Sequence, residues 1–308
     1  MKGVVIKSTG SWLTVKTAEN VIYNCRIKGK FRIQGIKSTN PIAVGDLVAF
    51  DLEDDDSGTI HKVEERKNYI IRKSTKLSKQ THIIAANMDQ AAIIVSVANP
   101  RTPLGFIDRF LATAEAYRIP SIVIFNKVDL CNDELAEELD YLKAVYESLG
   151  YQCLLTSAIN NAGIEESKGL FKDKVTLISG QSGVGKSTLI NAIEPSLELK
   201  TREVSESNEK GKHTTTFAEM FEFSFGGSVI DTPGIRSFGV VDFDKHELSH
   251  FFREFFVIGK GCKYGDCHHI NEPHCAVKKG IENGEIAESR YTSYWNLYID
   301  EDLEKDYK

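Results

Sequence analysis

The chain has 308 residues, which is more than one ordinary domain and favours two or three. Hydrophobic residues at 41% and charged residues at 27% exclude a wholly disordered or fibrous protein. The longest apolar run, residues 91–98, is far shorter than the roughly 20 residues that cross a bilayer. Because the first residues also lack the apolar core of a secretory signal, we expect a cytoplasmic protein with no membrane partner.

Charge is distributed unevenly along the chain, whose net charge is −6. The first 50 residues hold eight lysines and arginines against two acids, and residues 66–79 add six basic residues without an acid. A basic N-terminal region in an acidic protein is consistent with a surface that binds a polyanion. It is equally consistent with a solvated surface whose charge is uneven.

The first 68 residues predict a small β-barrel. Short β-branched or alternating stretches are separated by glycine-containing turns, a pattern typical of barrels such as the OB-fold. Such barrels often bind RNA through basic and aromatic side chains, although a barrel that only supports its neighbour is the alternative. The predicted strands are 3–8, 11–17, 21–27, 47–52 and 59–65.

Beyond the barrel, strands and helices alternate, which predicts a parallel sheet with helices on both faces. The expected strands are 91–98, 121–125, 152–156 and 174–179, and the expected helices are 105–117 and 133–149. A hairpin over 217–223 and 227–231 and a helical tail follow. We therefore expect an OB-fold domain over 1–68, an α/β domain over 69–236 and a mainly helical metal-binding domain over 237–308.

The strongest motif lies between a predicted strand and a predicted helix and has the phosphate-loop pattern. Its glycines allow backbone N–H groups to surround a β-phosphate, and the helix N-terminus adds its positive end. Lys186 is expected to reach the β- and γ-phosphates as a catalytic group, and Ser187 to bind Mg²⁺. The loop consists of Gly180, Gln181, Ser182, Gly183, Val184, Gly185, Lys186 and Ser187.

A second motif, Asn126-Lys127-Val128-Asp129, ends the predicted strand 121–125 and selects guanine. The Asp129 carboxylate can accept hydrogen bonds from guanine N1–H and N2–H₂, a donor pair that adenine lacks. Asn126 can connect this loop to the phosphate loop, and the Lys127 stem can cover the base. Ser157 and Ala158, after the next strand, fit the loop whose backbone N–H meets guanine O6.

The γ-phosphate would be sensed by Asp231-Thr232-Pro233-Gly234. We expect Asp231 to hold Mg²⁺ through water and the Gly234 N–H to meet the γ-phosphate. The polar segment 210–216 has the character of a mobile switch, and Thr215 is our choice for its Mg²⁺ ligand.

The motifs stand in an unusual order. In the usual small GTPase the phosphate loop comes first, whereas here the base-reading motifs precede it. The sequence therefore predicts a circularly permuted GTPase, in which the γ-phosphate-sensing loop leads directly into the C-terminal domain.

Ile235 occupies the position at which many GTPases carry the glutamine that orients the attacking water. Isoleucine cannot do this, so hydrolysis must be slow or depend on another group. His213 is the nearest polar candidate for a catalytic role; a role in stabilising its loop or meeting a partner is equally compatible.

Six cysteines in an apparently cytosolic chain argue against disulfides, and three of them cluster late. Cys262, Cys267 and Cys275 lie within 14 residues, together with three histidines that compete as a fourth ligand, His268, His269 and His274. Three thiolates and an imidazole suit tetrahedral Zn²⁺, and four protein ligands predict a structural site.

Taken together, these motifs resemble the RsgA (YjeQ) family of circularly permuted GTPases over essentially all 308 residues. The most specific segments are 180–191, 212–216 and 262–294. The resemblance implies GTP contacts by residues 126–129 and 180–188, Thr188 included, and one Zn²⁺ held by Cys262, Cys267, His269 and Cys275.

The resemblance further implies a GTP hydrolase that binds the small ribosomal subunit and its rRNA, assists late maturation of that subunit and is stimulated by it. We expect a monomer that uses GTP and GDP with Mg²⁺ and docks through Arg26, Lys28, Lys30 and Arg32. The alternative is a signalling or metabolic GTPase whose flanking domains bind protein; a non-enzymatic RNA-binding module conflicts with the intact nucleotide motifs.

Overall fold

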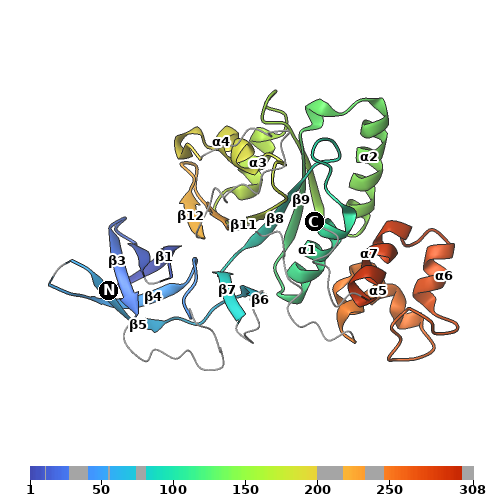
Figure 1. Cartoon of the computed structure of the whole chain (residues 1–308), viewed down its shortest axis with the longest axis horizontal. Coiled ribbons are helices and arrows are strands. Elements are labelled where there is room, and N and C mark those ends of the chain that lie inside the picture. The colour runs from blue at the N-terminus through green and yellow to red at the C-terminus, as the bar shows by residue number, and fades with distance from the viewer. Residues whose placement is uncertain are drawn as a thin grey trace, which may run out of the picture.

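The computed structural model describes residues 1–10, 12–27, 41–54, 56–73, 81–199, 218–232 and 246–299. Three parts follow one another along the molecule (Figure 1): a barrel at one end, an α/β layer in the middle and a group of helices at the other end. No helix in these ranges is long and apolar enough to cross a membrane.

The N-terminal part is a closed barrel of five strands, as predicted. The strand order β1-β2-β3-β5-β4 is completed by pairing of β1 with β4. Alternate side chains point inward and form a compact core that includes Val5, Val15 and Phe50. The strands are β1 (Lys2–Ser8), β2 (Leu13–Thr17), β3 (Ile22–Ile27), β4 (Leu47–Leu52) and β5 (Gly58–Val63).

The central sheet has the order β10-β9-β8-β11-β13-β12, and all its pairings are parallel except that of β12 with β13. Its strands are β8 (Gln90–Val95), β9 (Ser121–Asn126), β10 (Gln152–Thr156), β11 (Val175–Ser179), β12 (Glu219–Glu222) and β13 (Ser228–Asp231). The strands β8 and β9 are buried on both faces, as their continuous apolar sequences predict.

Helices cover both faces of this sheet, in accordance with the prediction. On one face, α1 (Leu104–Ala116) and α2 (Asp133–Ser148) pack over one apolar cluster, and Asn132 caps α2 by accepting a hydrogen bond from the Leu135 N–H. On the other face, α3 (Ile164–Phe171) and α4 (Lys186–Ile193) cover a second cluster.

A short hairpin that the sequence reading missed, β6 (Tyr69–Lys73) with β7 (Thr81–Ala86), connects the barrel to the sheet. Val44 of the barrel lies in the core of the central domain, and its carbonyl accepts a hydrogen bond from the Ala86 N–H at 2.9 Å. The buried Asp46 carboxylate accepts two hydrogen bonds from Arg66, at 2.6 and 2.7 Å. The end of the barrel that carries Val44 and Asp46, here called its base, is thus firmly attached to the central domain.

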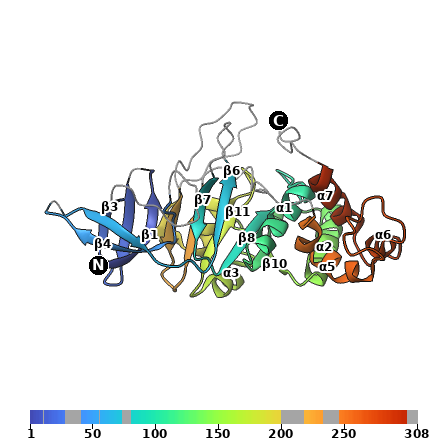
Figure 2. The same ribbon diagram turned by 90° about the horizontal axis from the view of Figure 1, so that it is seen from below.

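The C-terminal part contains α5 (Arg253–Ile258), α6 (Ala276–Glu282) and α7 (Glu288–Ile299), with the short 3₁₀ turns η3 (Leu248–Phe251) and η4 (Gly259–Gly261). Figure 2 shows these helices beside α1 and α2, at the end of the molecule opposite the barrel. The buried Arg290 guanidinium donates to Asp108 of α1 at 2.6 Å and to Glu254 of α5 at 2.7 Å. This charged cluster connects the helical part to the central domain.

Candidate functional site

The phosphate loop lies at the carboxyl end of β11 and leads into α4, as its sequence pattern predicts. Gly180, Gly183 and Gly185 have φ angles of 148°, 85° and 92°, which side chains with a Cβ rarely adopt. A Cβ on Gly180 would lie 2.3 Å from the Ile94 carbonyl oxygen, and one on Gly185 would lie 2.7 Å from the Asn126 amide. The loop therefore requires glycine for close backbone approach as well as for its φ angles.

Lys186 lies within the curve of this loop. Its ammonium group donates to the carbonyl oxygens of Gly180 and Gln181, at 2.6 and 2.8 Å. Burial lowers the pKa of Lys186, and the Asp231 carboxylate opposes that shift. The lysine is thus held next to the backbone N–H groups that would surround a β-phosphate.

The two nucleotide motifs meet through Asn126. Its Nδ2 donates to the Val184 carbonyl in the phosphate loop at 2.8 Å, and its Oδ1 accepts from the Thr156 hydroxyl at 3.0 Å. Because all three residues are buried, the amide orientation is fixed by both contacts. The predicted connection between the base-reading loop and the phosphate loop is present in this geometry.

Lys127 and Asp129 lie in the loop after β9, which the sequence predicts to read the base. Asp129 lies on the 3₁₀ turn η1 (Val128–Leu130) and accepts a hydrogen bond from the Ser157 hydroxyl. Lys127 adopts a left-handed backbone conformation, and its ammonium group donates to the Asn99 carbonyl at 2.8 Å. The sequence reading missed Asn99, since a backbone acceptor leaves no signal in residue type.

Oxygen groups suited to Mg²⁺ flank the phosphate loop. Asp231 ends β13, the parallel neighbour of β11, and Ser187 stands in the first turn of α4. A carboxylate and a hydroxyl are ligands that Mg²⁺ accepts beside nucleotide phosphates, so these residues fit the ion. The buried hydroxyls of Ser179 and Thr232 have no hydrogen-bond partner among the described residues.

Several predicted residues lie outside the described residues. They are Lys28, Lys30, Arg32, His213, Thr215, Gly234 and Ile235, and their predicted roles stay predictions. Thr188 is described: it is exposed in the first turn of α4.

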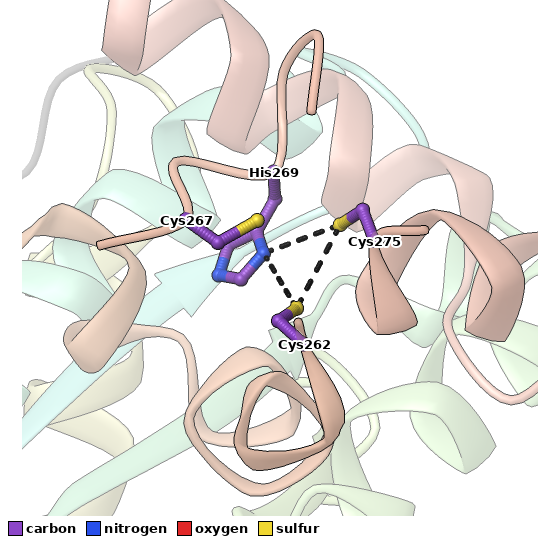
Figure 3. Close-up of side chains that lie close together, drawn as sticks. All are labelled: Cys262, Cys267, His269 and Cys275. Carbon is purple, nitrogen blue, oxygen red and sulfur yellow. Dashed lines mark hydrogen bonds between the residues drawn. The ribbon is translucent and has the colours of Figure 1, made fainter. Parts of the chain in front are cut away.

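The structure brings together the four residues of the Cys/His cluster (Figure 3). The Cys262 and Cys275 sulfurs are 3.9 Å apart, and His269 Nδ1 is 3.6 Å from the first and 3.4 Å from the second. Bonds of about 2.3 Å to sulfur and 2.0 Å to nitrogen around a tetrahedral Zn²⁺ give edges of about 3.5 to 3.8 Å. Three of the four ligand atoms therefore have nearly the spacing of a tetrahedral zinc site, and all four lie within 4.8 Å of one another, so the cluster could hold a metal ion.

Of the three competing histidines, His269 points into the cluster. Tyr291 and Tyr294 donate to the carbonyls of His269 and His268, at 2.9 and 2.7 Å, which fixes the loop between the ligands. The ring of His268 lies against those of His246 and Tyr298, and His274 is exposed. The geometry thus favours the ligand set that the family resemblance implied.

Burial makes the cluster unfavourable for free thiolates. It raises the pKa of Cys267 to about 12 and also raises the pKa of Cys275, while it lowers the pKa of His269. A bound cation would supply the charge that holds the thiolates ionised, which is a further reason to assign a metal to these residues.

A mostly parallel sheet with a phosphate loop after β11 and base-reading loops after β9 and β10 defines a P-loop GTPase. The base-reading loops precede the phosphate loop in the chain, so the class is that of the circularly permuted GTPases.

Comparison with known sequences names the family. The model of the RsgA GTPase family matches residues 63–241, and that of the RsgA N-terminal domain matches residues 2–60. The chain belongs to the RsgA family of GTPases, and it is therefore a GTP hydrolase.

Curated relatives match along the whole chain. A protein of Christiangramia forsetii is 55% identical, covering 100% of this chain and 98% of the relative. One of Flavobacterium psychrophilum is 52% identical, covering 98% and 94%. Both are called small ribosomal subunit biogenesis GTPase RsgA.

Solved structures support the same assignment. YjeQ from Thermotoga maritima is 38% identical, with a TM-score of 0.77 and 96% of each chain covered. YloQ, described as a circularly permuted GTPase, is 31% identical, with a TM-score of 0.73, covering 96% of this chain and 93% of that one. The permutation predicted from motif order is thus confirmed.

Proposed function

We propose that this GTPase binds the small ribosomal subunit and assists its late maturation in the cytoplasm, with hydrolysis stimulated by the subunit. The observation that carries the proposal is the similarity, over nearly the full chain, to relatives named for small-subunit biogenesis. A signalling or metabolic role is not favoured, because the similarity includes both flanking parts as well as the GTPase core.

In this proposal guanine is read by Asp129, with its carboxylate oriented by the Ser157 hydroxyl. Lys186 and the loop N–H groups of 180–188 hold the phosphates, and Ser187, Thr215 and Asp231 serve Mg²⁺, which would neutralise charge on the β- and γ-phosphates. Gly234 would sense the γ-phosphate. His213 is our candidate for the residue that orients the attacking water, because the Ile235 side chain has no polar group.

We further propose three domains, 1–68, 69–236 and 237–308, acting as a monomer, with Zn²⁺ as the structural ion of the last. RNA contact would come in part from the barrel. Trp12 is 41% exposed, and the Arg26 guanidinium lies 4.9 Å above its ring. An exposed aromatic ring beside a cation suits base stacking and phosphate contact.

Co-sedimentation with purified small ribosomal subunits tests the partner. Wild-type protein with a non-hydrolysable GTP analogue should pellet with the subunits, and Lys186→Ala, which should lose the phosphate contacts, should pellet much less in the presence of the same analogue. Wild-type protein that stays in the supernatant at low salt would refute the ribosomal assignment while leaving GTP binding intact.

A further inference from the structure

The barrel contacts the central sheet at a second place, the edge strand β12, in addition to its anchored base. Lys7 of β1 is the register partner of Glu219, and its ammonium group lies 3.0 and 2.9 Å from the two carboxylate oxygens. The Ser8 N–H donates to the Ala218 carbonyl at 3.4 Å. Figures 1 and 2 both show β12 on the side of the sheet that faces the barrel.

Glu219 has a second register partner on its other side, namely Asp231 of β13. Direct cross-strand partners share one face of a sheet and have Cβ atoms about 5 Å apart. Lys7, Glu219 and Asp231 therefore form a continuous row from the barrel to the carboxylate assigned to Mg²⁺. Lys186 also interacts with the Asp231 charge, and loss of the Lys7 cation would leave the Glu219 carboxylate beside Asp231 without its ion-pair partner.

This contact is weaker than the one at the base of the barrel. The Lys7 and Glu219 side chains are 39% and 31% exposed, whereas Arg66 and Asp46 at the base are 7% and 0% exposed. A second ion pair, Lys16 with Glu222, lies at the far end of β12, where the register partner of Glu222 is Ser228. Only the Lys7 pair is thus aligned with Asp231.

We propose that Lys7 is a positioning residue for the phosphate site: through Glu219 it holds Asp231 in the arrangement that binds Mg²⁺ and nucleotide. The inference rests on the proposed role of Asp231. Because linkage is reciprocal, Mg²⁺-nucleotide must in turn strengthen the contact between β1 and β12. The barrel is then part of the GTPase site as well as an RNA-binding element.

The test compares the affinity for fluorescent GDP with and without Mg²⁺ in the intact protein. In Lys7→Met the enhancement by Mg²⁺ should fall two- to fivefold, the range expected for a half-exposed ion pair. Lys7→Arg, which keeps the charge, should restore it. In the wild type, Mg²⁺ and GDP together should slow amide hydrogen exchange in β1, and this slowing should be smaller in Lys7→Met.

Lys16→Met is the matched control, since it removes another barrel cation that pairs with β12, at Glu222, away from Asp231. An equal loss in both variants would show general loosening of the barrel and would overturn the proposal, as would an unchanged Lys7→Met. A wild type without any enhancement by Mg²⁺ would overturn the Asp231 assignment and this inference with it.

Discussion

At the scale of single residues, we assign the choice of base to the Asp129 carboxylate. Asp129 is exposed and, among the described residues, accepts a hydrogen bond from the Ser157 hydroxyl, which leaves acceptor capacity for a base. A site that hydrogen-bonds a polar group of its substrate rejects analogues without that group far more strongly than a site that recognises apolar shape alone.

Asp129→Asn should weaken GTP binding by about 10²-fold or more and shift preference toward xanthosine triphosphate, because the new amide donates where guanine also donates. Competition binding with both nucleotides measures this. Unaltered GTP affinity would refute the base-reading assignment.

Arg290 is the second decisive residue, since it is buried between two carboxylates. Burial raises the pKa of Asp108, and the Arg290 charge opposes that rise. Tyr146 adds a hydrogen bond to the same carboxylate at 2.9 Å. Removal of the cation would leave buried carboxylates without their counter-charge.

Arg290→Met should lower the free energy of unfolding by about 3 to 5 kcal/mol. Arg101→Met, which removes an exposed pair with Glu138, should cost less than about 1 kcal/mol. Urea unfolding of both variants makes the comparison, and equal effects would contradict the structural role of the buried cluster.

Residue type alone predicted some parts of the site and not others. The phosphate loop and the three cysteines of the Cys/His cluster were predictable, because their chemistry requires particular residues at fixed spacing, whereas the choice of His269 came from the family resemblance. The Arg290–Asp108 pair spans 182 positions, and a charged helix residue is expected at the surface unless a partner is known. The barrel–Asp231 row likewise depends on strand register, which the sequence does not display.

At the scale of elements, most boundaries followed from periodicity and the misses have physical reasons. The helix α3 has eight residues and contains Gly169, so its intrinsic helix propensity is weak. The strand β6 lies within the basic segment 66–79, whose composition is typical of a solvated surface, and β7 follows that segment. The helix α3 and the β6–β7 hairpin both form because tertiary packing overrides local preference.

The barrel segment that packs against β7 requires a glycine at position 45. Gly45 has a φ of 92°, and a Cβ there would lie 2.0 Å from the Ala86 carbonyl oxygen. Gly10 has a similar φ of 88°, but a Cβ there would meet nothing within 4 Å.

Gly45→Ala should therefore destabilise the protein clearly more than Gly10→Ala, which should cost only about 1 to 2 kcal/mol for its backbone conformation. Chemical unfolding of the two variants isolates the steric contribution. Equal losses would show that the close approach at Gly45 is relaxed in solution.

Metal binding by the Cys/His cluster should depend on pH through its thiols. Without metal, the raised pKa of Cys267, about 12, keeps that thiol protonated at neutral pH, so metal binding must displace protons. The apparent affinity for Zn²⁺ should thus fall by more than about tenfold for each unit that pH is lowered, because more than one thiol proton is released.

Competition with a chromophoric chelator at two pH values measures this affinity. Metal analysis should find one Zn²⁺ per chain in the wild type and a loss of metal in Cys267→Ser, with the C-terminal helices unfolding before the GTPase core. Affinity that does not vary with pH would exclude thiolate ligation.

At the scale of the whole molecule, the GTPase core lies between a barrel with a weak second contact and a helical part held by buried charges (Figure 2). The segment after Asp231, to which we assign γ-phosphate sensing, leads into the helical part along the chain, and β12 contacts the barrel. Both flanking parts therefore have a physical route to the phosphate site.

Docking through phosphate contacts should make subunit binding steeply salt-dependent. If four or more phosphates are contacted, affinity should fall on the order of 10²-fold between 50 and 200 mM salt. Arg26→Glu should weaken binding and flatten this dependence, whereas Lys172→Glu, at the end of α3, serves as the charge-matched control. Sedimentation over a salt series gives both slopes; a slope near zero would contradict an RNA-directed barrel.

The most direct measurement is the rate of GTP hydrolysis with and without purified small ribosomal subunits at low salt. Because Ile235 cannot orient water, the account predicts slow turnover by the protein alone and a large acceleration by the subunits. Arg26→Glu should lose much of the acceleration and keep the basal rate. An unchanged rate for wild-type protein on addition of subunits would contradict the ribosomal assignment.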